Sequence, residues 1–134
     1  MRRQIINPWS WQEQAGFVQG HAVDGGGRTI YCAGQTSVDG DGSPVHEGDM
    51  AGQISQALDN VETVLRESGA SLADVVRLNY YTTDVDAFLA AQDVLTARLR
   101  AAGCRPTATL LGVSRLAFPP LLVEIEATAV AEAK

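Results

Sequence analysis

Apolar residues recur at a helical spacing in the stretch 50–68. The residues that form this stripe are Met50, Ile54, Leu58, Val61 and Leu65, with Ala57 and Val64 widening it. Asp49 stands at the position of a helix N-cap, and Gly69 follows as a helix stop. The pattern predicts an amphipathic helix over 50–68.

A second helix is predicted over 84–102. Its apolar stripe consists of Phe88, Ala91, Leu95 and Leu99, and Gly103 follows its last turn. Both stripes have the period of an α-helix, so each helix is expected to bury one side.

Runs rich in β-branched and aromatic residues predict the strands. They lie at 17–23, 29–35, 75–82, 107–113 and 122–130, with a short further strand near 4–6. Three glycines, Gly25 to Gly27, separate the first two long runs and predict a hairpin. Because strand–helix–strand units favour parallel pairing and adjacent strands favour hairpins, we expect an α+β fold: a mixed six-stranded sheet with two helices packed on one face.

The other face of such a sheet has no helix to cover it. In the last strand, Val123 and Ile125 alternate with Glu124 and Glu126, while Leu122 shares the face of the two glutamates. Neither face is purely polar, and burial against another subunit accounts for this pattern. The alternative is a monomer with one solvated sheet face, which antiparallel sheets tolerate.

Length and composition narrow the functional class. The chain has 134 residues and is expected to form one domain, 1–134. Its net charge of −6 argues against a nucleic-acid partner, because phosphate contacts need clustered Lys and Arg.

No run approaches the roughly 20 apolar residues of a membrane span, and no signal peptide is visible, so we expect no membrane partner and a cytoplasmic location. Cys32 and Cys104 are expected to be buried thiols in a reducing compartment.

Five short motifs follow one another along nearly the whole chain. They are AGFVQG at 15–20, YCAGQ at 31–35, QALDNV at 56–61, GASLADVV at 69–76 and LVEIEA at 122–127. In order and spacing they resemble the RidA (YjgF/YER057c/UK114) family, whose better-known members hydrolyse reactive enamines and imines. The resemblance implies a chorismate-mutase-like α+β fold and a homotrimer with a small-molecule cleft between each pair of subunits.

The resemblance also implies the residues of that cleft. The pocket aromatic falls on Phe17, the strand-end glycine on Gly34, and the glutamate that positions a water on Glu124. The family's catalytic arginine, which binds the substrate carboxylate, falls on Ala108, and a cysteine common nearby falls on Leu110. Strand alternation allows Ala108, Leu110 and Glu124 to line one cleft, which would then be more apolar than in the family.

The missing arginine changes the expected activity. Without a guanidinium at Ala108, efficient hydrolysis of 2-aminoacrylate-like substrates is not expected, because a free carboxylate in an apolar cleft is costly. Arg105 or Arg115 would have to compensate for it. Three hypotheses follow: an enzyme of this type with an altered substrate, a non-catalytic trimer that binds a metabolite, and, least favoured, a ribonuclease. No cofactor is expected, and no metal site, since His21 and His46 have no partner signature.

Overall fold

The computed structural model describes residues 1–133. Helix α1 spans Met50–Glu67, close to the predicted 50–68, and buries the predicted apolar stripe. The Asp49 side chain caps it by accepting a hydrogen bond from the Gly52 N–H at 2.9 Å. Gly69 follows with φ of 80°, a left-handed conformation that ends a helix at little cost for glycine.

The second predicted helix is broken at Ala91. It consists of α2, Val85–Ala90, and α3, Gln92–Ala101. Ala91 has φ of −99° and ψ of 6°, and its N–H bonds to the carbonyls of both Ala87 and Phe88, which tightens the turn. Phe88 and Leu95 remain fully buried on either side of the break, so the core contacts predicted for one helix are kept by two.

Four strands form the main sheet, in the order β3-β6-β4-β5. These are β3, Gly27–Thr36; β4, Val75–Thr82; β5, Thr107–Gly112; and β6, Val123–Glu132. Strands β4 and β5 are parallel, as their helical crossover requires, and β6 runs antiparallel to both β3 and β4. The expected α+β architecture with a mixed sheet is therefore confirmed.

The first two strands lie outside this sheet. Strand β1, Arg2–Ile6, pairs antiparallel with β2, Gly20–Asp24, in a sheet of their own. The expectations of one six-stranded sheet and of a hairpin between 17–23 and 29–35 were therefore wrong. All five residues of β2 pair with β1, and β3 finds its ladder on the ten-residue β6, so Gly25, with φ of 90°, redirects the chain from one sheet to the other.

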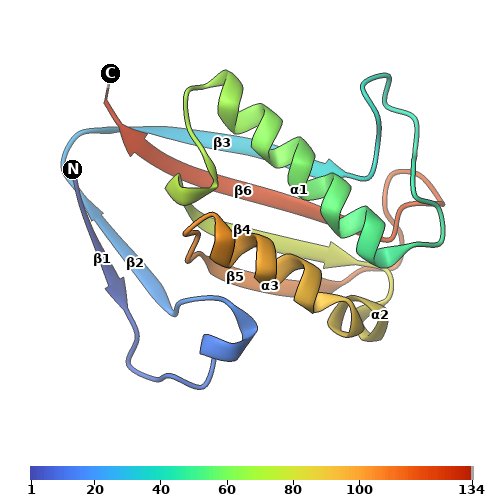
Figure 1. Ribbon diagram of the computed structural model, residues 1–134, viewed down its shortest axis with the longest axis horizontal. Helices are drawn as coiled ribbons and strands as arrows, with labels where there is room; N and C mark the ends of the chain where they lie inside the picture. The colour runs from blue at the N-terminus through green and yellow to red at the C-terminus, as the bar shows by residue number, and fades with distance from the viewer. Residues whose placement is uncertain (134) are drawn as a thin grey trace.

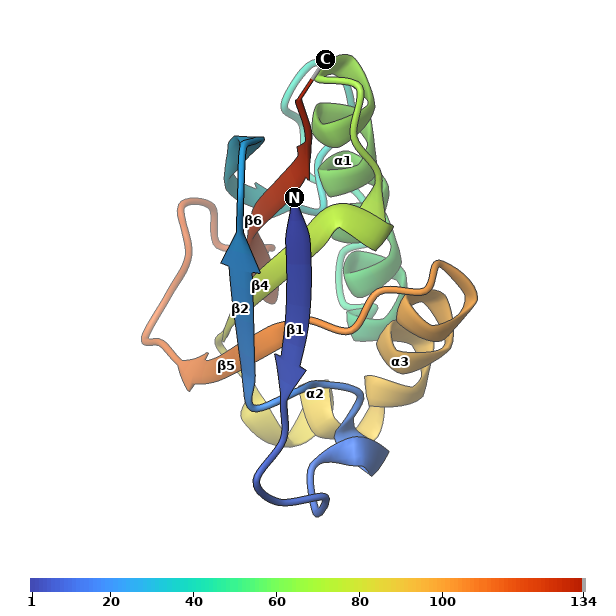
Figure 2. The ribbon, with the colours of Figure 1, turned by 90° about the vertical axis from the view of Figure 1, so that its left-hand side faces the viewer.

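Helices α1 and α3 cover one face of the four-stranded sheet (Figures 1 and 2). The side chains of β6 alternate accordingly, with Val123, Ile125 and Ala127 buried against the helices and Glu124 and Glu126 half-buried on the other side. That other side, which no helix of residues 1–133 covers, is called the open face below. Its exposed apolar side chains include Tyr31, which is 80% exposed.

Buried Gln53 on α1 ties two long loops to the helix layer. Its side-chain N–H groups donate to the His46 carbonyl at 3.2 Å and the Pro120 carbonyl at 2.9 Å. Its side-chain oxygen accepts from the Leu122 N–H at 2.8 Å. Both loops are thereby held beside the start of β6, and the Leu122 N–H that Gln53 accepts from lies two residues before Glu124.

Candidate functional site

Glu124 and Gly34 lie against each other on the open face. The pairing of β3 with β6 shifts register between Cys32 and Gln35, so Ala33 and Gly34 form a bulge. A Cβ added at Gly34 would overlap the Glu124 carboxylate. The carboxylate therefore occupies the space that a side chain would fill at any other residue, which explains the glycine. Among residues 1–133, the Glu124 side chain accepts no hydrogen bond.

Ala108 and Leu110 lie on the opposite side of the same sheet. In the parallel pairing of β4 with β5, they stand opposite Leu78 and Tyr80, which are buried under the helices. Both pack as half-buried residues against that core. Glu124 instead pairs with Tyr81, on the open face. Within one chain, the expectation that Ala108, Leu110 and Glu124 line one cleft was wrong. The alternation within each strand shows which residues share a face of that strand, but it does not show which faces of two strands lie on the same side of the sheet.

A polar cluster accompanies Glu124 on the open face. The Tyr81 hydroxyl donates to Glu126 Oε1 at 3.0 Å, and the Asn79 amide donates to the same oxygen at 2.9 Å. The hydrogen bond from Tyr81 to Glu126, together with partial desolvation and the negative charges of Glu126 and Glu124, raises the pKa of Tyr81. The sequence pattern does not indicate this cluster, since Tyr81 and Glu126 are 45 residues apart and meet only through strand register.

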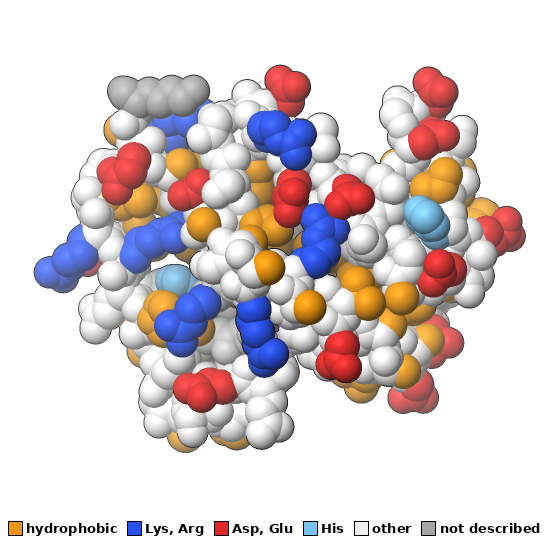
Figure 3. Space-filling view, in the orientation of Figure 1, with side chains coloured by type: hydrophobic (Ala, Val, Ile, Leu, Met, Phe, Trp, Pro, Cys, Tyr) orange, Lys and Arg blue, Asp and Glu red, His pale blue; other side chains and the backbone are white. Residues whose placement is uncertain are grey.

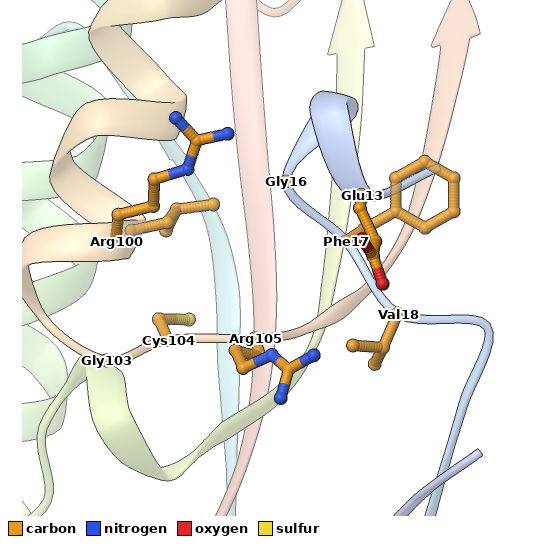
Figure 4. Close-up of a pocket in the computed structure, with 9 residues that line it drawn as sticks. Glu13, Gly16, Phe17, Val18, Arg100, Gly103, Cys104 and Arg105 are labelled. Atoms are coloured by element: carbon orange, nitrogen blue, oxygen red, sulfur yellow. The ribbon is translucent and has the colours of Figure 1, made fainter. Parts of the chain in front are cut away.

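Phe17 lies far along the chain from these residues, in the segment between β1 and β2. It follows a short 3-10 turn, Glu13–Ala15, and its ring packs edge-on against Trp11 with centroids 6.0 Å apart. The segment is held by a buried amide network in which Gln12 donates to Asn7 and accepts from Gln19. Phe17 also lines a cavity of about 410 Å³ beside the end of α3 (Figure 4).

The two arginines considered as substitutes for the missing one have different surroundings. Arg105 lines the same cavity as Phe17, together with Arg100 from α3. Arg115 lies in the loop between β5 and β6, where its Nε donates to the Leu116 carbonyl at 3.2 Å. Arg105 is thus the one of the two that the fold brings next to a residue of the predicted site. Nothing in the sequence pattern connected Arg100 with this cavity.

The remaining candidate groups are buried or dispersed. Cys32 and Cys104 are both buried and unbridged, and burial raises the pKa of both thiols, that of Cys104 to about 12. The His21 ring lies against the Arg105 carbonyl at 2.6 Å. Within residues 1–133, no three His, Cys, Asp or Glu side chains gather as a metal site. None of the helices in this part of the chain is both long and apolar enough to cross a bilayer.

Solved structures share this fold. A Rid-family protein of unknown function from Yersinia pestis superposes with a TM-score of 0.87 at 37% identity, covering 96% of this chain and 98% of the other. The YjgF gene product of Escherichia coli superposes with a TM-score of 0.70 at 30% identity, covering 85% and 87%. A member of the YjgF/YER057c/UK114 family from Mycobacterium tuberculosis gives 0.62 at 33% identity, covering 96% and 98%.

Sequence relatives agree with the structural neighbours. A RutC family protein from Pyrococcus abyssi is 32% identical over 106 residues, which are 79% of this chain and 81% of the relative. The model of the family described as endoribonuclease L-PSP matches residues 11–131. The resemblance drawn from the five motifs is thereby confirmed, and the chain belongs to the endoribonuclease L-PSP family, the RidA/YjgF family of proteins.

Proposed function

We propose that this protein binds a small metabolite in a cleft between subunits and hydrolyses a C=N or related bond there. The observation that carries the proposal is the Glu124 carboxylate, which lies over the Gly34 bulge without a hydrogen-bond partner in residues 1–133. A carboxylate so placed is available to accept a hydrogen bond from a water. A relative from Dermatophagoides farinae, 30% identical over 69 residues (52% of this chain and 54% of that protein), is named a 2-iminobutanoate/2-iminopropanoate deaminase.

The proposed reaction needs no oxidant or reductant. The water oxygen adds to the imine carbon while Glu124 takes a proton from that water and passes it to the imine nitrogen, which gives an amine and a hydroxyl on the same carbon. The hydroxyl proton then moves to the nitrogen as the carbon–nitrogen bond breaks, leaving a carbonyl compound and ammonia. Glu124 is the only residue to which we give a role in moving protons, and the backbone at Gly34 would form part of the pocket wall.

The substrate is proposed to differ from 2-aminoacrylate. Ala108 offers no guanidinium to a carboxylate and packs against the core. Losing a hydrogen bond to a charged group costs about 1.5–3 kcal/mol, or roughly 10–200-fold in binding. A neutral compound, or one with its charge elsewhere, fits this cleft better.

The cleft is proposed to form in a homotrimer, as the resemblance implies. Phe17, Ala108 and Leu110 lie on the helix side of the sheet or beyond it, whereas Gly34 and Glu124 lie on the open face. These two groups of residues can line one cleft only if one group comes from one copy of the chain and the other group from a second copy. Tyr31→Glu would place a charge on the open face and should yield monomers in light scattering, while Thr63→Glu on an exposed part of α1 should not. A monomeric wild-type protein would refute the assembly.

Two other functions remain as alternatives. A non-catalytic metabolite-binding trimer is favoured by the structure of E. coli TdcF with bound serine, which matches with a TM-score of 0.71 at 28% identity, covering 87% and 88%. The family description names an endoribonuclease, but the net charge of −6 opposes RNA binding.

We also propose that residues 1–134 form one domain and act in the cytoplasm. A Saccharomyces cerevisiae relative, 29% identical over 105 residues (78% and 68%), is named mitochondrial.

The deciding experiment generates 2-aminoacrylate in a coupled assay and follows ammonia and pyruvate release. The wild type should accelerate release little, and Ala108→Arg should accelerate it more. Thr63→Arg is the matched control, because it adds the same charge on an exposed part of α1, away from the open face. Strong acceleration by the wild type would refute the proposal that the substrate differs from 2-aminoacrylate. A substrate screen in which no turnover depends on Glu124 would favour the metabolite-binding alternative.

A further inference from the structure

A cavity of about 410 Å³ separates the end of α3 from the segment that follows the 3-10 turn (Figure 4). Buried Val18, Leu99 and Cys104 form its apolar part. Arg100 and Arg105 extend from the α3 side toward the segment that carries Gly16 to Val18. All of these residues belong to one chain, so the cavity is complete without a second copy. Gly34 and Glu124 of the same chain lie outside it, on the open face, and Phe17 is the one residue that it shares with the cleft proposed above.

The two guanidinium groups at this cavity are unpaired. Within residues 1–133, neither Arg100 nor Arg105 forms an ion pair or a side-chain hydrogen bond, although Arg98, two residues before Arg100, pairs with Asp59 and Glu62. The only carboxylate in the cavity wall is Glu13. The wall therefore has a net positive charge in a protein whose net charge is −6. Figure 3 shows arginine side chains gathered where the N-terminal segment meets the helix layer.

Arg105 projects from a backbone that is held on both sides. The His21 ring contacts its carbonyl at 2.6 Å, and the Cys104 N–H donates to the Leu99 carbonyl at 2.8 Å. The next carbonyl, that of Pro106, accepts from the Val18 N–H at 2.8 Å. A guanidinium on a fixed backbone loses less conformational freedom when it binds a ligand than one on a loose loop.

We propose that this cavity binds a small organic carboxylate that carries an apolar group. The two guanidiniums would hold the carboxylate through charge-assisted hydrogen bonds, and the apolar group would lie against Val18, Leu99 and Cys104. The positive charge of Arg100, in the last turn of α3, also interacts favourably with the helix dipole. This interaction alone would explain an arginine at position 100. That explanation does not extend to Arg105, which follows the end of α3 at Ala101.

The test uses 3-phenylpropionate as the probe in isothermal titration calorimetry on the full-length protein. Its neutral match, 3-phenylpropionamide, keeps the shape and removes the charge. Arg100→Ala and Arg105→Ala should each weaken binding of the acid by about tenfold or more. Arg115→Ala removes the same charge from a loop outside the cavity and should change the affinity less than about twofold, since exposed charges act weakly at a distance. Arg105→Gln replaces Arg105→Ala if the latter does not fold.

Each result decides for or against the site. Tighter binding of the acid than of the amide, lost in the two cavity variants alone, supports it. Equal binding of acid and amide, or equal losses in the cavity variants and Arg115→Ala, overturns it. Inorganic phosphate that binds as tightly as the acid would refute the role of the apolar group. Glu124→Ala should bind the acid at least as tightly as the wild type, because it removes a negative charge and leaves both guanidiniums in place, whereas it should abolish the hydrolysis proposed above; the two proposals can therefore fail separately.

Discussion

Replacing Gly34 by alanine puts a Cβ into the space that the Glu124 carboxylate occupies. The new atom would lie 2.6 Å from the carboxyl carbon of Glu124 and 2.9 Å from its Cγ, both too close for non-bonded atoms. The Glu124 side chain must therefore rotate away. Moving it off its rotamer costs about 0.5–1.5 kcal/mol.

The backbone itself should accept the alanine. Gly34 does not belong to the glycines with positive φ, and an alanine in an allowed conformation stabilises a protein by about 0.4–1 kcal/mol through the unfolded state. When Gly34→Ala is made in the wild type, the cost of moving the Glu124 side chain and the gain through the unfolded state nearly cancel. When it is made in the Glu124→Ala variant, only the gain remains. The two substitutions should therefore show a coupling free energy of about 1 kcal/mol.

Urea unfolding of the four proteins in this cycle measures the coupling. All four are compared at one protein concentration, because assembly would add its own concentration dependence to the free energy of unfolding. If Gly34→Ala changes the free energy of unfolding equally in both backgrounds, within about 0.3 kcal/mol, the contact between Gly34 and Glu124 is not the one described.

Three further predictions concern stability and ionisation. Gln53→Ala removes a fully buried amide and leaves three partly buried backbone groups without their partner, so it should lower the free energy of unfolding by about 2–4 kcal/mol. Gln56→Ala on the same helix should cost less than about 1 kcal/mol, and equal losses would contradict the role of Gln53. Glu126→Ala should lower the pKa of Tyr81 in a spectrophotometric titration, since it removes the acceptor that raises it; an unchanged tyrosinate curve would refute that hydrogen bond. Asp49→Ala should lower the free energy of unfolding by about 0.5–2 kcal/mol through loss of the helix cap, and no change would show that the cap is replaced by water.

The helices were the most predictable part of the fold. A stripe of apolar residues and an N-cap depend only on neighbours within a few turns, so α1 was predicted to within one residue at its C-terminal end. The break at Ala91 had no such signal, because alanine is the best helix former and nothing in the sequence marks it as a boundary. The local pattern also could not tell which strand would pair with which, and so it predicted a hairpin that is absent.

The candidate site was predictable as a set of residues but not as an arrangement. The five motifs identified the family, and the glycine and glutamate they indicated do lie together, at Gly34 and Glu124. The cavity beside Phe17 was missed because its arginines come from two segments that meet only in the folded chain.

The distribution of the predicted residues over two faces links the site to assembly. A sheet separates Glu124 from Ala108, so no rotation of either side chain can bring them into one cleft within a chain. The open face, with its exposed Tyr31 and the half-buried carboxylate of Glu124, offers surface that a second copy would cover. If the cleft forms between copies, any Glu124-dependent turnover must fall when Tyr31→Glu dissociates the protein, although neither Glu124 nor Gly34 is altered. Full turnover by a monomeric Tyr31→Glu variant would mean that Glu124 acts on the open face of a single chain, without Phe17 or Ala108.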